Sequence, residues 1–286
     1  MTNNKTIFVT GGTGNQGGAV ARKLAQQGFT VKVLTRNPNS AKALALKKLN
    51  VVLVQGDLNT ADTYREHLRD AYGIFSVQTF ENGNDKEIQQ GITLATLGKV
   101  LDIKHFLYSS VFGANLSTGI PHIDSKFQIE NYIRETGLPF TIIRPTSLFE
   151  NFLIPQVKKG ILKGKLVQPI NRDTVQQYVA AEDIGNAAAR IFSNYNDYVG
   201  RTIPLATEQL TTKEVADTFS KVLHIKIEYK KLPVVITRLF LGKALYKMFK
   251  WMNEKSFFSK EDIELTKKEF PGLLSLEKWI EMNFKV

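Results

Sequence analysis

Short apolar runs alternate with longer stretches of helical periodicity through the first half of the chain. Runs rich in β-branched and aromatic residues predict strands at 5–10, 30–35, 51–55, 72–77, 104–110 and 139–144. The stretches between them predict helices around 15–28, 39–48, 61–70, 85–102 and 122–136. Strands that alternate with helices in this way form a parallel sheet with helices on both faces. The pattern therefore predicts an α/β fold, a Rossmann-type doubly wound parallel sheet.

The alternation weakens after about residue 152. A strand at 175–178, a helix capped by Asp183 and a strand near 201–205 are expected to complete the sheet, whereas 211–286 has mostly helical patterns. We therefore expect a dinucleotide-binding Rossmann domain and a smaller, mostly helical C-terminal substrate or lid lobe. Their expected bounds are 1–152, completed by 174–205, and 153–286.

Two long polar connections follow the fourth and fifth predicted strands, QTFENGND and FGANLSTGIP. Open α/β sheets bind their ligands at the carboxyl ends of the strands. Both connections are therefore expected near a ligand.

The composition is that of an ordinary globular protein, with 43% hydrophobic residues in 286. No apolar run reaches the roughly 18 residues that a membrane span requires, and the first predicted strand begins too early to leave room for a secretory signal. We therefore expect a cytoplasmic protein. The absence of cysteine excludes disulfides, thiolate metal sites and cysteine nucleophiles. The four histidines lack the spacing of metal ligands, so no metal site is expected.

The formal net charge is +11 and the pI is about 9.6, which favours anionic partners such as a phosphorylated ligand or nucleic acid. In the C-terminal third, Lys243, Lys247 and Lys250 lie on one face of an apolar helical run, ITRLFLGKALYKMFKWM. We favour a helix that packs through its leucines and aromatic residues and leaves its lysines in solvent; a membrane surface or a partner helix is the alternative. The chain has no helix-turn-helix or ribbon signature. Neither a membrane nor nucleic acid is therefore expected as a direct partner.

The most informative stretch is TGGTGNQGG, residues 10–18, which directly follows the first predicted strand and opens a helix. Gly11 permits the tight turn, Gly14 lets the backbone approach a pyrophosphate, and Gly17 lets the helix pack closely on the strand. The free N–H groups of residues 15–17 can face the phosphates. A turn without a ligand would not need so many glycines. The motif predicts a dinucleotide site.

The second predicted strand ends in Arg36, where an NAD-preferring site usually carries an acidic residue for the ribose hydroxyls. An arginine can hold a 2′-phosphate in a bidentate fork and stack on the adenine; an exposed arginine in a turn with Asn37 and Pro38 is the simpler alternative. NADP(H) is therefore favoured, and NAD(H) stays open. Asp57 closes the third predicted strand and could accept a hydrogen bond from the adenine amine or cap the helix after residue 60.

Several stretches spread over nearly the whole chain carry a family resemblance: VTGGTGNQGG, LTRNP, VQGDLN, HFLYSS, HIDSKFQIENYIRETGLPFTIIRP, LFEN and DIELTKKEFPGLLSLEKWIE. On these stretches the chain resembles the NmrA-like family of atypical short-chain dehydrogenase/reductases, in particular its branch of NADP(H)-binding redox sensors. The resemblance implies a Rossmann core, a small and mostly helical C-terminal lobe, and NADP(H) in the groove between them. It further implies that Lys126 contacts the nicotinamide ribose and that the LFEN loop, 148–151, lies near the nicotinamide.

Members of that family often carry a second basic residue shortly after the arginine. This chain has Asn39 and Ser40 there, with Lys42 as the nearest substitute. The motif and the resemblance together define a set of candidate cofactor-binding residues. They are Gly11, Thr13, Gly14, Asn15, Gln16, Gly17, Arg36, Asp57, Leu58, Gln78, Lys126, Phe149 and Asn151.

The segment PHIDSK, residues 121–126, lies where a short-chain reductase would carry its catalytic tyrosine and lysine. Lys126 is present, and Ser109 or Ser110 ends the fifth predicted strand at the place of the helper serine, but His122 stands where the tyrosine would be. We expect the neighbouring ammonium and a positive cleft to lower the pKa of this imidazole and leave it neutral at pH 7. Ser109, His122 and Lys126 are the candidate catalytic residues. A histidine at the start of a helix without a chemical function is equally open.

Two functions from different classes follow. The missing tyrosine favours an NADP(H)-responsive redox sensor, in which bound nucleotide changes a surface for a regulatory protein partner, with weak or no reductase activity. The retained serine and lysine keep a second function open, an NADPH-dependent oxidoreductase acting on a quinone, imine or similar small-molecule acceptor.

Overall fold

The computed structural model describes residues 3–240, 242–254 and 259–284. Two compact units make up the chain. The first contains Met1–Arg144 and Ala181–Ile203, and the second contains Pro145–Ala180 and Pro204–Val286. Each unit therefore includes two separate segments of the sequence.

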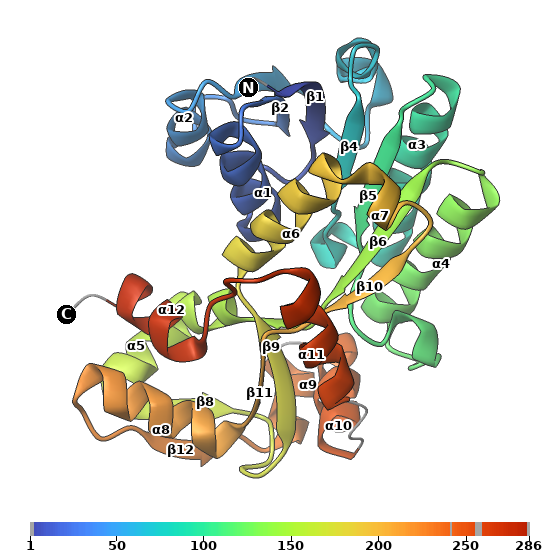
Figure 1. Cartoon of the computed structure of the whole chain (residues 1–286). Coiled ribbons are helices and arrows are strands. Elements are labelled where there is room, and N and C mark those ends of the chain that lie inside the picture. The colour runs from blue at the N-terminus through green and yellow to red at the C-terminus, as the bar shows by residue number, and fades with distance from the viewer. Residues whose placement is uncertain (1–2, 241, 255–258, 285–286) are drawn as a thin grey trace. The chain divides into compact units, whose positions relative to one another are not determined.

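A seven-stranded parallel sheet forms the centre of the first unit (Figure 1). In sheet order the strands are β10 (Thr202–Leu205), β6 (Phe140–Pro145), β5 (His105–Ser109), β4 (Gly73–Ser76), β1 (Asn3–Val9), β2 (Phe29–Thr35) and β3 (Val52–Gln55). The chain runs outward from β1 in one direction through β2 and β3, and in the other through β4, β5 and β6. The order reverses between β1 and β4, and the carboxyl ends at such a reversal are where doubly wound sheets bind ligands.

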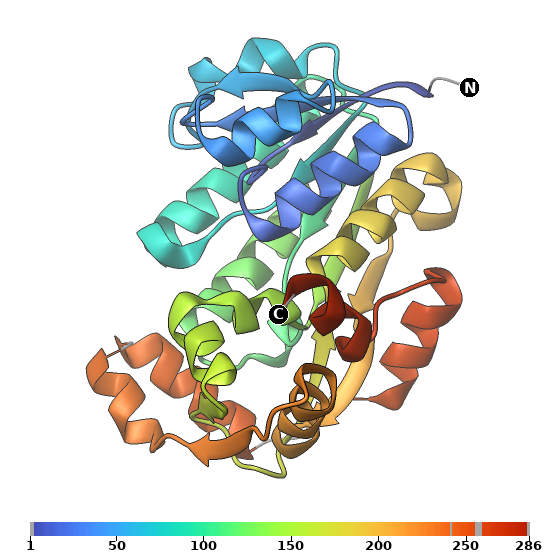
Figure 2. The same cartoon turned by 90° about the vertical axis from the view of Figure 1, so that its left-hand side faces the viewer.

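Helices cover both faces of this sheet. α1 (Asn15–Gln26) and α6 (Ala181–Ser193) pack against each other on one face, and α3 (Asn84–Val100) and α4 (Pro121–Glu135) pack against each other on the other. Figure 2 shows the same arrangement turned by 90°. Because both faces are covered, the central strands β4 and β5 are buried along their whole length. The shorter helices of this unit are α2 (Ala41–Lys47) and α7 (Tyr195–Tyr198).

The predicted helix at 61–70 is wrong. The chain there forms two short 3-10 helices, Ala61–Thr63 and Arg65–Leu68, separated by Tyr64. Tyr64 has φ −134° and is fully buried, with its ring 6.0 Å from that of Phe8. Burying this ring against the sheet outweighs the helical propensity of the surrounding residues.

The second unit contains two small sheets. β9 (Val175–Val179) pairs antiparallel with β11 (Glu208–Thr211) and parallel with the short β7 (Ser147–Leu148). β8 (Lys165–Gln168) pairs with β12 (Glu228–Lys231). The expectation that 175–178 completes the large sheet is therefore wrong, because both edges of β9 are occupied by strands of the second unit; β10 alone extends the large sheet. Asp183 lies inside the first turn of α6 and is not its cap.

Helices make up most of the remainder of the second unit. They are α5 (Pro155–Leu162), α8 (Thr212–Leu223), α9 (Val234–Phe240), α10 (Gly242–Glu254), α11 (Lys260–Glu269) and α12 (Leu276–Asn283). The predicted helical character of 211–286 is thus confirmed over its described residues. An aromatic core holds this unit together, built on Phe149, Phe152, Tyr178, Phe219 and Trp279. Within the described ranges, no helix is both long enough and apolar enough to cross a membrane.

Candidate functional site

The glycine loop leaves β1 at the point where the strand order reverses. Thr10 ties it to the end of β4, since its Oγ1 accepts from the N–H of Val77 at 2.8 Å and donates to the Val77 carbonyl at 3.0 Å. Gly11 has φ +62°, which favours glycine, and its carbonyl accepts from the N–H of Gly14 at 2.8 Å. These bonds hold the loop in a defined turn between two neighbouring strand ends.

The first turn of α1 has no protein cap. Gly14 is the N-cap residue, and among the described residues no side-chain cap accepts from the N–H groups that follow it. The N–H groups of Asn15, Gln16 and Gly17 therefore lack intrahelical acceptors, and the helix dipole makes this end partly positive. Gly17 permits the close approach of helix and loop, because a Cβ there would lie 2.4 Å from the carbonyl oxygen of Thr10. The arrangement can accept an anionic group such as a pyrophosphate.

A pocket of about 330 Å³ opens beside this loop, at the carboxyl end of β2. Two cationic side chains, Arg36 and Lys42, contribute to its wall, and no acidic residue does. The full lining is Thr13, Thr35, Arg36, Asn37, Ser40, Ala41 and Lys42. Thr13 belongs to the glycine loop, so the pocket and the loop are continuous.

Asp57 and Leu58 lie at the end of β3 and do not line this pocket. One carboxylate oxygen of Asp57 accepts from the backbone N–H and from the side-chain amide of Asn59, both at 2.8 Å. Leu58 packs against the apolar core of the first unit. Asp57 thus stabilises its own turn, and the adenine contact proposed for it stays a prediction.

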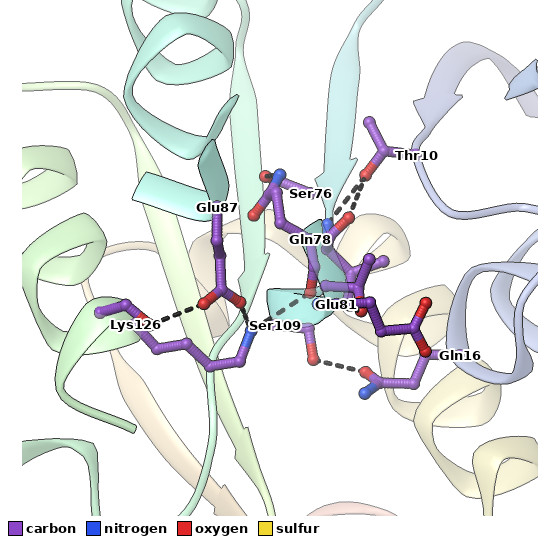
Figure 3. Close-up of polar contacts among 11 residues, drawn as sticks. Thr10, Gln16, Ser76, Gln78, Glu81, Glu87, Ser109 and Lys126 are labelled. Atoms are coloured by element: carbon purple, nitrogen blue, oxygen red, sulfur yellow. Dashed lines mark hydrogen bonds and ion pairs between the residues drawn. The ribbon is translucent and has the colours of Figure 1, made fainter. Parts of the chain in front are cut away.

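Lys126, on α4, is held by a buried carboxylate (Figure 3). Its Nζ lies 2.8 Å from Oε1 of Glu87 and donates to the backbone carbonyl of Gln78 at 3.3 Å. Glu87, on α3, has no exposed side-chain surface, and its other oxygen accepts from Ser125 Oγ at 2.6 Å. Since 11% of the Lys126 side chain is exposed, the ammonium has a fixed position at the carboxyl edge of the sheet.

His122 lies one helical turn before Lys126 and is mostly buried, with 7% of its surface exposed. Its ring stacks on that of Phe80, with centroids 4.6 Å apart and planes inclined by 26°. Burial is the largest cause that lowers its pKa; Glu87 opposes this effect and Lys126 adds to it. The expected direction of the pKa shift is confirmed, but its expected cause is corrected. Desolvation lowers the pKa more than the neighbouring ammonium does, and the Glu87 carboxylate raises it.

Ser109 ends β5, and its buried hydroxyl donates to Oε1 of Gln16 at 2.6 Å. This bond links β5 to the first turn of α1 (Figure 3). Gln78 is buried as well: its amide group donates to Ser76 Oγ at 2.9 Å, while its Oε1 has no hydrogen-bond partner among the described residues. The site therefore contains an acceptor that a ligand donor could satisfy.

Phe149 and Asn151 belong to the second unit. The Phe149 side chain is fully buried there, 5.8 Å from the ring of Tyr178 and 5.6 Å from that of Trp279, whereas Asn151 is exposed. Phe149 thus has a packing function in its own unit. The nicotinamide contacts implied by the resemblance stay predictions.

Sequence reasoning missed two residues that touch the candidates. Glu87 holds Lys126, and Phe80 covers His122. Glu87 could have been identified from the sequence. Positions 87, 90, 91 and 94 follow the i, i+3, i+4, i+7 spacing of a buried helix face, and a carboxylate on such a face needs a partner. Phe80 lies in the polar connection after the fourth strand, which was expected near a ligand. Nowhere in the described parts of the chain do three His, Asp or Glu side chains group as metal ligands.

Comparison with known proteins adds to this geometry. A profile of the NmrA-like family matches residues 3–281. An NmrA-like family domain-containing protein of Dictyostelium discoideum is 31% identical over 245 residues, which span 79% of this chain and 80% of that protein. The solved structure of Nmra, a negative transcriptional regulator in complex with NAD, has a TM-score of 0.82 at 24% identity and covers 98% of this chain and 95% of its own; another structure of Nmra, in complex with NADP, has a TM-score of 0.80. An NADPH-dependent quinone oxidoreductase from Escherichia coli, complexed with NADPH, has a TM-score of 0.76 at 20% identity and covers 98% of this chain and 100% of its own.

Proposed function

The chain belongs to the NmrA-like family, and we propose that it binds NADP(H) along the glycine loop and the basic pocket of its first unit. The pyrophosphate would lie on the uncapped N–H groups at the start of α1, where the backbone at Gly14 leaves room for it. The complexes of Nmra with NAD and NADP, and of the quinone oxidoreductase with NADPH, support a nicotinamide dinucleotide as the class of ligand.

The basic pocket supports NADP(H) over NAD(H). Arg36 and Lys42 line it together with the hydroxyl side chains of Thr13 and Ser40, and none of the described residues of its lining is a carboxylate that would bind ribose hydroxyls. A 2′-phosphate would neutralise the two cations and accept from the hydroxyls. Lys42 thus takes the place of the second basic residue that the family often carries closer to the arginine.

Lys126 would bind the nicotinamide ribose. Its ammonium has three N–H donors, of which Glu87 and the Gln78 carbonyl engage two. The third can reach a ribose hydroxyl, and the unpartnered Oε1 of Gln78 offers an acceptor nearby. Glu87 would therefore act as a positioning residue that holds the ammonium for the nucleotide.

We further propose that the protein is a nucleotide-responsive regulator with little or no reductase activity. The observation that carries this proposal is the state of His122: its imidazole is buried, stacked under Phe80 and has a lowered pKa, so it is neutral at pH 7 and a poor proton source for an alkoxide. The Ser109 hydroxyl is likewise engaged by Gln16. A regulator needs only that two conformations bind the nucleotide with different affinity.

A second candidate function is NADPH-dependent reduction of a quinone, imine or similar acceptor. Ser109 and Lys126 both lie at the carboxyl edge of the sheet, and the chain is similar to a quinone oxidoreductase. Acceptors of this kind take up hydride readily, so they would demand less of a proton donor than a simple carbonyl.

NADPH oxidation measured over a panel of quinones, imines and aldehydes separates the two functions. The regulator is expected to show an NADPH-dependent rise in melting temperature and no oxidation above buffer for any acceptor. The regulator proposal fails if the protein reduces a quinone or imine briskly and if His122→Ala abolishes that rate while NADPH affinity is unchanged.

Nucleotide preference is tested by calorimetric titration of Arg36→Ala, with Arg65→Ala as a matched control on an exposed turn of the same unit. Loss of a bidentate charged contact costs about 1.5–3 kcal/mol, so NADPH affinity should fall roughly tenfold to a hundredfold while NADH affinity and the control change little. Equal affinity of the parent protein for NADPH and NADH would contradict the assignment of the basic pocket.

A further inference from the structure

The helices α9 and α10 pack against each other in the second unit (Figure 1). The sequence pattern favoured packing through leucines and aromatic residues, and Leu245, Phe249 and Trp251 of α10 are half-buried. On α9, Thr237 is the one fully buried residue. Leu239 and Phe240 are each 80% exposed, and Val235 is 62% exposed. Among the described residues, Leu239 and Phe240 are the two most exposed large apolar side chains. The expected packing is therefore confirmed for α10, whose Lys243, Lys247 and Lys250 are exposed; the large apolar side chains left in solvent belong to α9.

The same segment has a one-sided charge. Residues 229–253 contain no aspartate or glutamate and six basic residues, Lys230, Lys231, Arg238, Lys243, Lys247 and Lys250. Arg238 directly precedes the exposed Leu239 and Phe240 on α9, and Lys243 lies near the start of α10. Lys250 lies 3.8 Å from Glu254, and both side chains are more than half exposed, so this pair contributes little.

The C-terminal end of α10 is held to the second unit by hydrogen bonds of Asn253. Oδ1 of Asn253 accepts from the N–H of Asn171 at 2.6 Å, and its Nδ2 donates to the carbonyl of Pro169 at 2.9 Å. The exposed apolar residues Val235, Leu239 and Phe240 all lie on α9. We name the segment Leu232–Asn253 the basic hairpin; its structure is described except at residue 241.

We propose that the basic hairpin docks on an anionic lipid surface. Val235, Leu239 and Phe240 would enter the boundary between headgroups and acyl chains, and the surrounding lysines and arginine would contact lipid phosphates and anionic headgroups. A short apolar insertion and a polybasic patch are each weak, but together they support peripheral binding. The protein would then bind membranes at their surface.

The charge argues against other occupants. A second copy of the chain would bring its own cations against these, and like charges facing each other oppose association. Nucleic acid would attract the cations but would leave Leu239 and Phe240 in water. An anionic lipid surface satisfies both kinds of side chain at once.

Flotation of the full chain with lipid vesicles tests the proposal. Binding is expected to vesicles of phosphatidylcholine containing about a third phosphatidylglycerol, to be absent with phosphatidylcholine alone, and to fall as salt is raised. Leu239→Ser with Phe240→Ser should weaken binding by about a hundredfold, since two large apolar side chains lose their insertion. Lys243→Gln with Lys247→Gln should weaken it by about tenfold to thirtyfold.

Two matched controls sharpen the test. Val100→Ser removes an apolar side chain that is 63% exposed on α3, and Lys278→Gln removes an exposed lysine of α12; neither should change vesicle binding. All variants should keep the melting temperature and the NADPH response of the parent, because the altered side chains are exposed. The proposal is overturned if the hairpin variants bind vesicles as the parent does. It is equally overturned if the parent ignores anionic vesicles and Leu239→Ser with Phe240→Ser instead abolishes a dimer or binding to duplex DNA.

Discussion

Gly14 and Gly17 of the loop at residues 10–18 should have different effects when they are replaced, one on nucleotide binding and the other on stability. At Gly17 an added Cβ would lie 2.4 Å from the carbonyl oxygen of Thr10 and 2.5 Å from two atoms of Gly11. At Gly14 the only described atom within 4 Å is the Gly11 carbonyl oxygen, at 3.1 Å. The backbone of Gly14, with φ −89° and ψ −177°, is one that any residue adopts. Gly17 is therefore required by the fold, whereas for Gly14 we propose that the ligand requires it.

The distances set the magnitudes. Ordinary contact begins at 3.4 Å, so the methyl group of Gly17→Ala overlaps backbone atoms by about 1 Å, and no side-chain rotation can relieve this. Overpacking costs about 1–3 kcal/mol, and contact with backbone places Gly17→Ala at the upper end. At roughly 2–4 °C per kcal/mol for a chain of this size, the melting temperature should fall by about 6–12 °C. Gly14→Val loses a good N-cap residue, which costs about 1 kcal/mol.

Thermal unfolding with and without NADPH measures both effects. Gly14→Val should melt within about 4 °C of the parent but lose the NADPH-dependent rise, because its side chain would occupy the space of the pyrophosphate. Gly17→Ala should melt much lower. Gly98→Ala, on α3, is the control, since its Cβ would meet a side-chain atom of Phe106 at 3.3 Å and alanine favours the helix.

Either of two results would refute this reasoning. A full NADPH response in Gly14→Val would mean that the pyrophosphate does not lie on this loop. A melting temperature for Gly17→Ala equal to that of Gly98→Ala would mean that the contact between α1 and the loop is not close in solution.

Two further predictions concern buried charges of the first unit. Glu87→Gln and Lys126→Met should each lower the free energy of unfolding in denaturant by about 3–5 kcal/mol, because each leaves a buried charge without its partner. The double variant should recover most of this stability without recovering NADPH affinity. Additive losses would show that the two side chains are not coupled. Glu130 is fully buried against Arg134 and Arg144, and although burial alone would raise its pKa, the hydrogen bonds from these arginines lower it. Its contribution to stability is therefore present above the unfolded pKa of about 4.3 and is lost as the pH falls through the lower folded pKa. Denaturant unfolding at a series of pH values should show a shallower loss at acid pH for Glu130→Gln than for the parent, and equal slopes would contradict this assignment.

Local patterns were sufficient for much of the fold. The six strands predicted from apolar runs occur as β1 to β6, because each run is short, β-branched or aromatic and bounded by turn residues. The glycine loop was predicted as well, since the tight turn, the close helix and the free N–H groups all depend on neighbours within eight residues. The same local reasoning placed Arg36 at a strand end, and β2 does end at Thr35, directly before it. Arg36 lines the pocket at this end of the strand.

Features that depend on partners far apart in the sequence were decided by the tertiary structure. Glu87 and Lys126 are 39 residues apart, and no periodicity on either helix identifies the other residue of the pair. β9 resembles a strand of the large sheet, yet its membership depends on which edges β7 and β11 occupy. The basic hairpin shows the same limit in reverse: the apolar residues of α10 are half-buried as their pattern predicts, but nothing in the sequence states that Leu239 and Phe240 of α9 will stay in solvent. A pattern along the chain specifies which surface an element would bury, and only packing in three dimensions determines what, if anything, buries it.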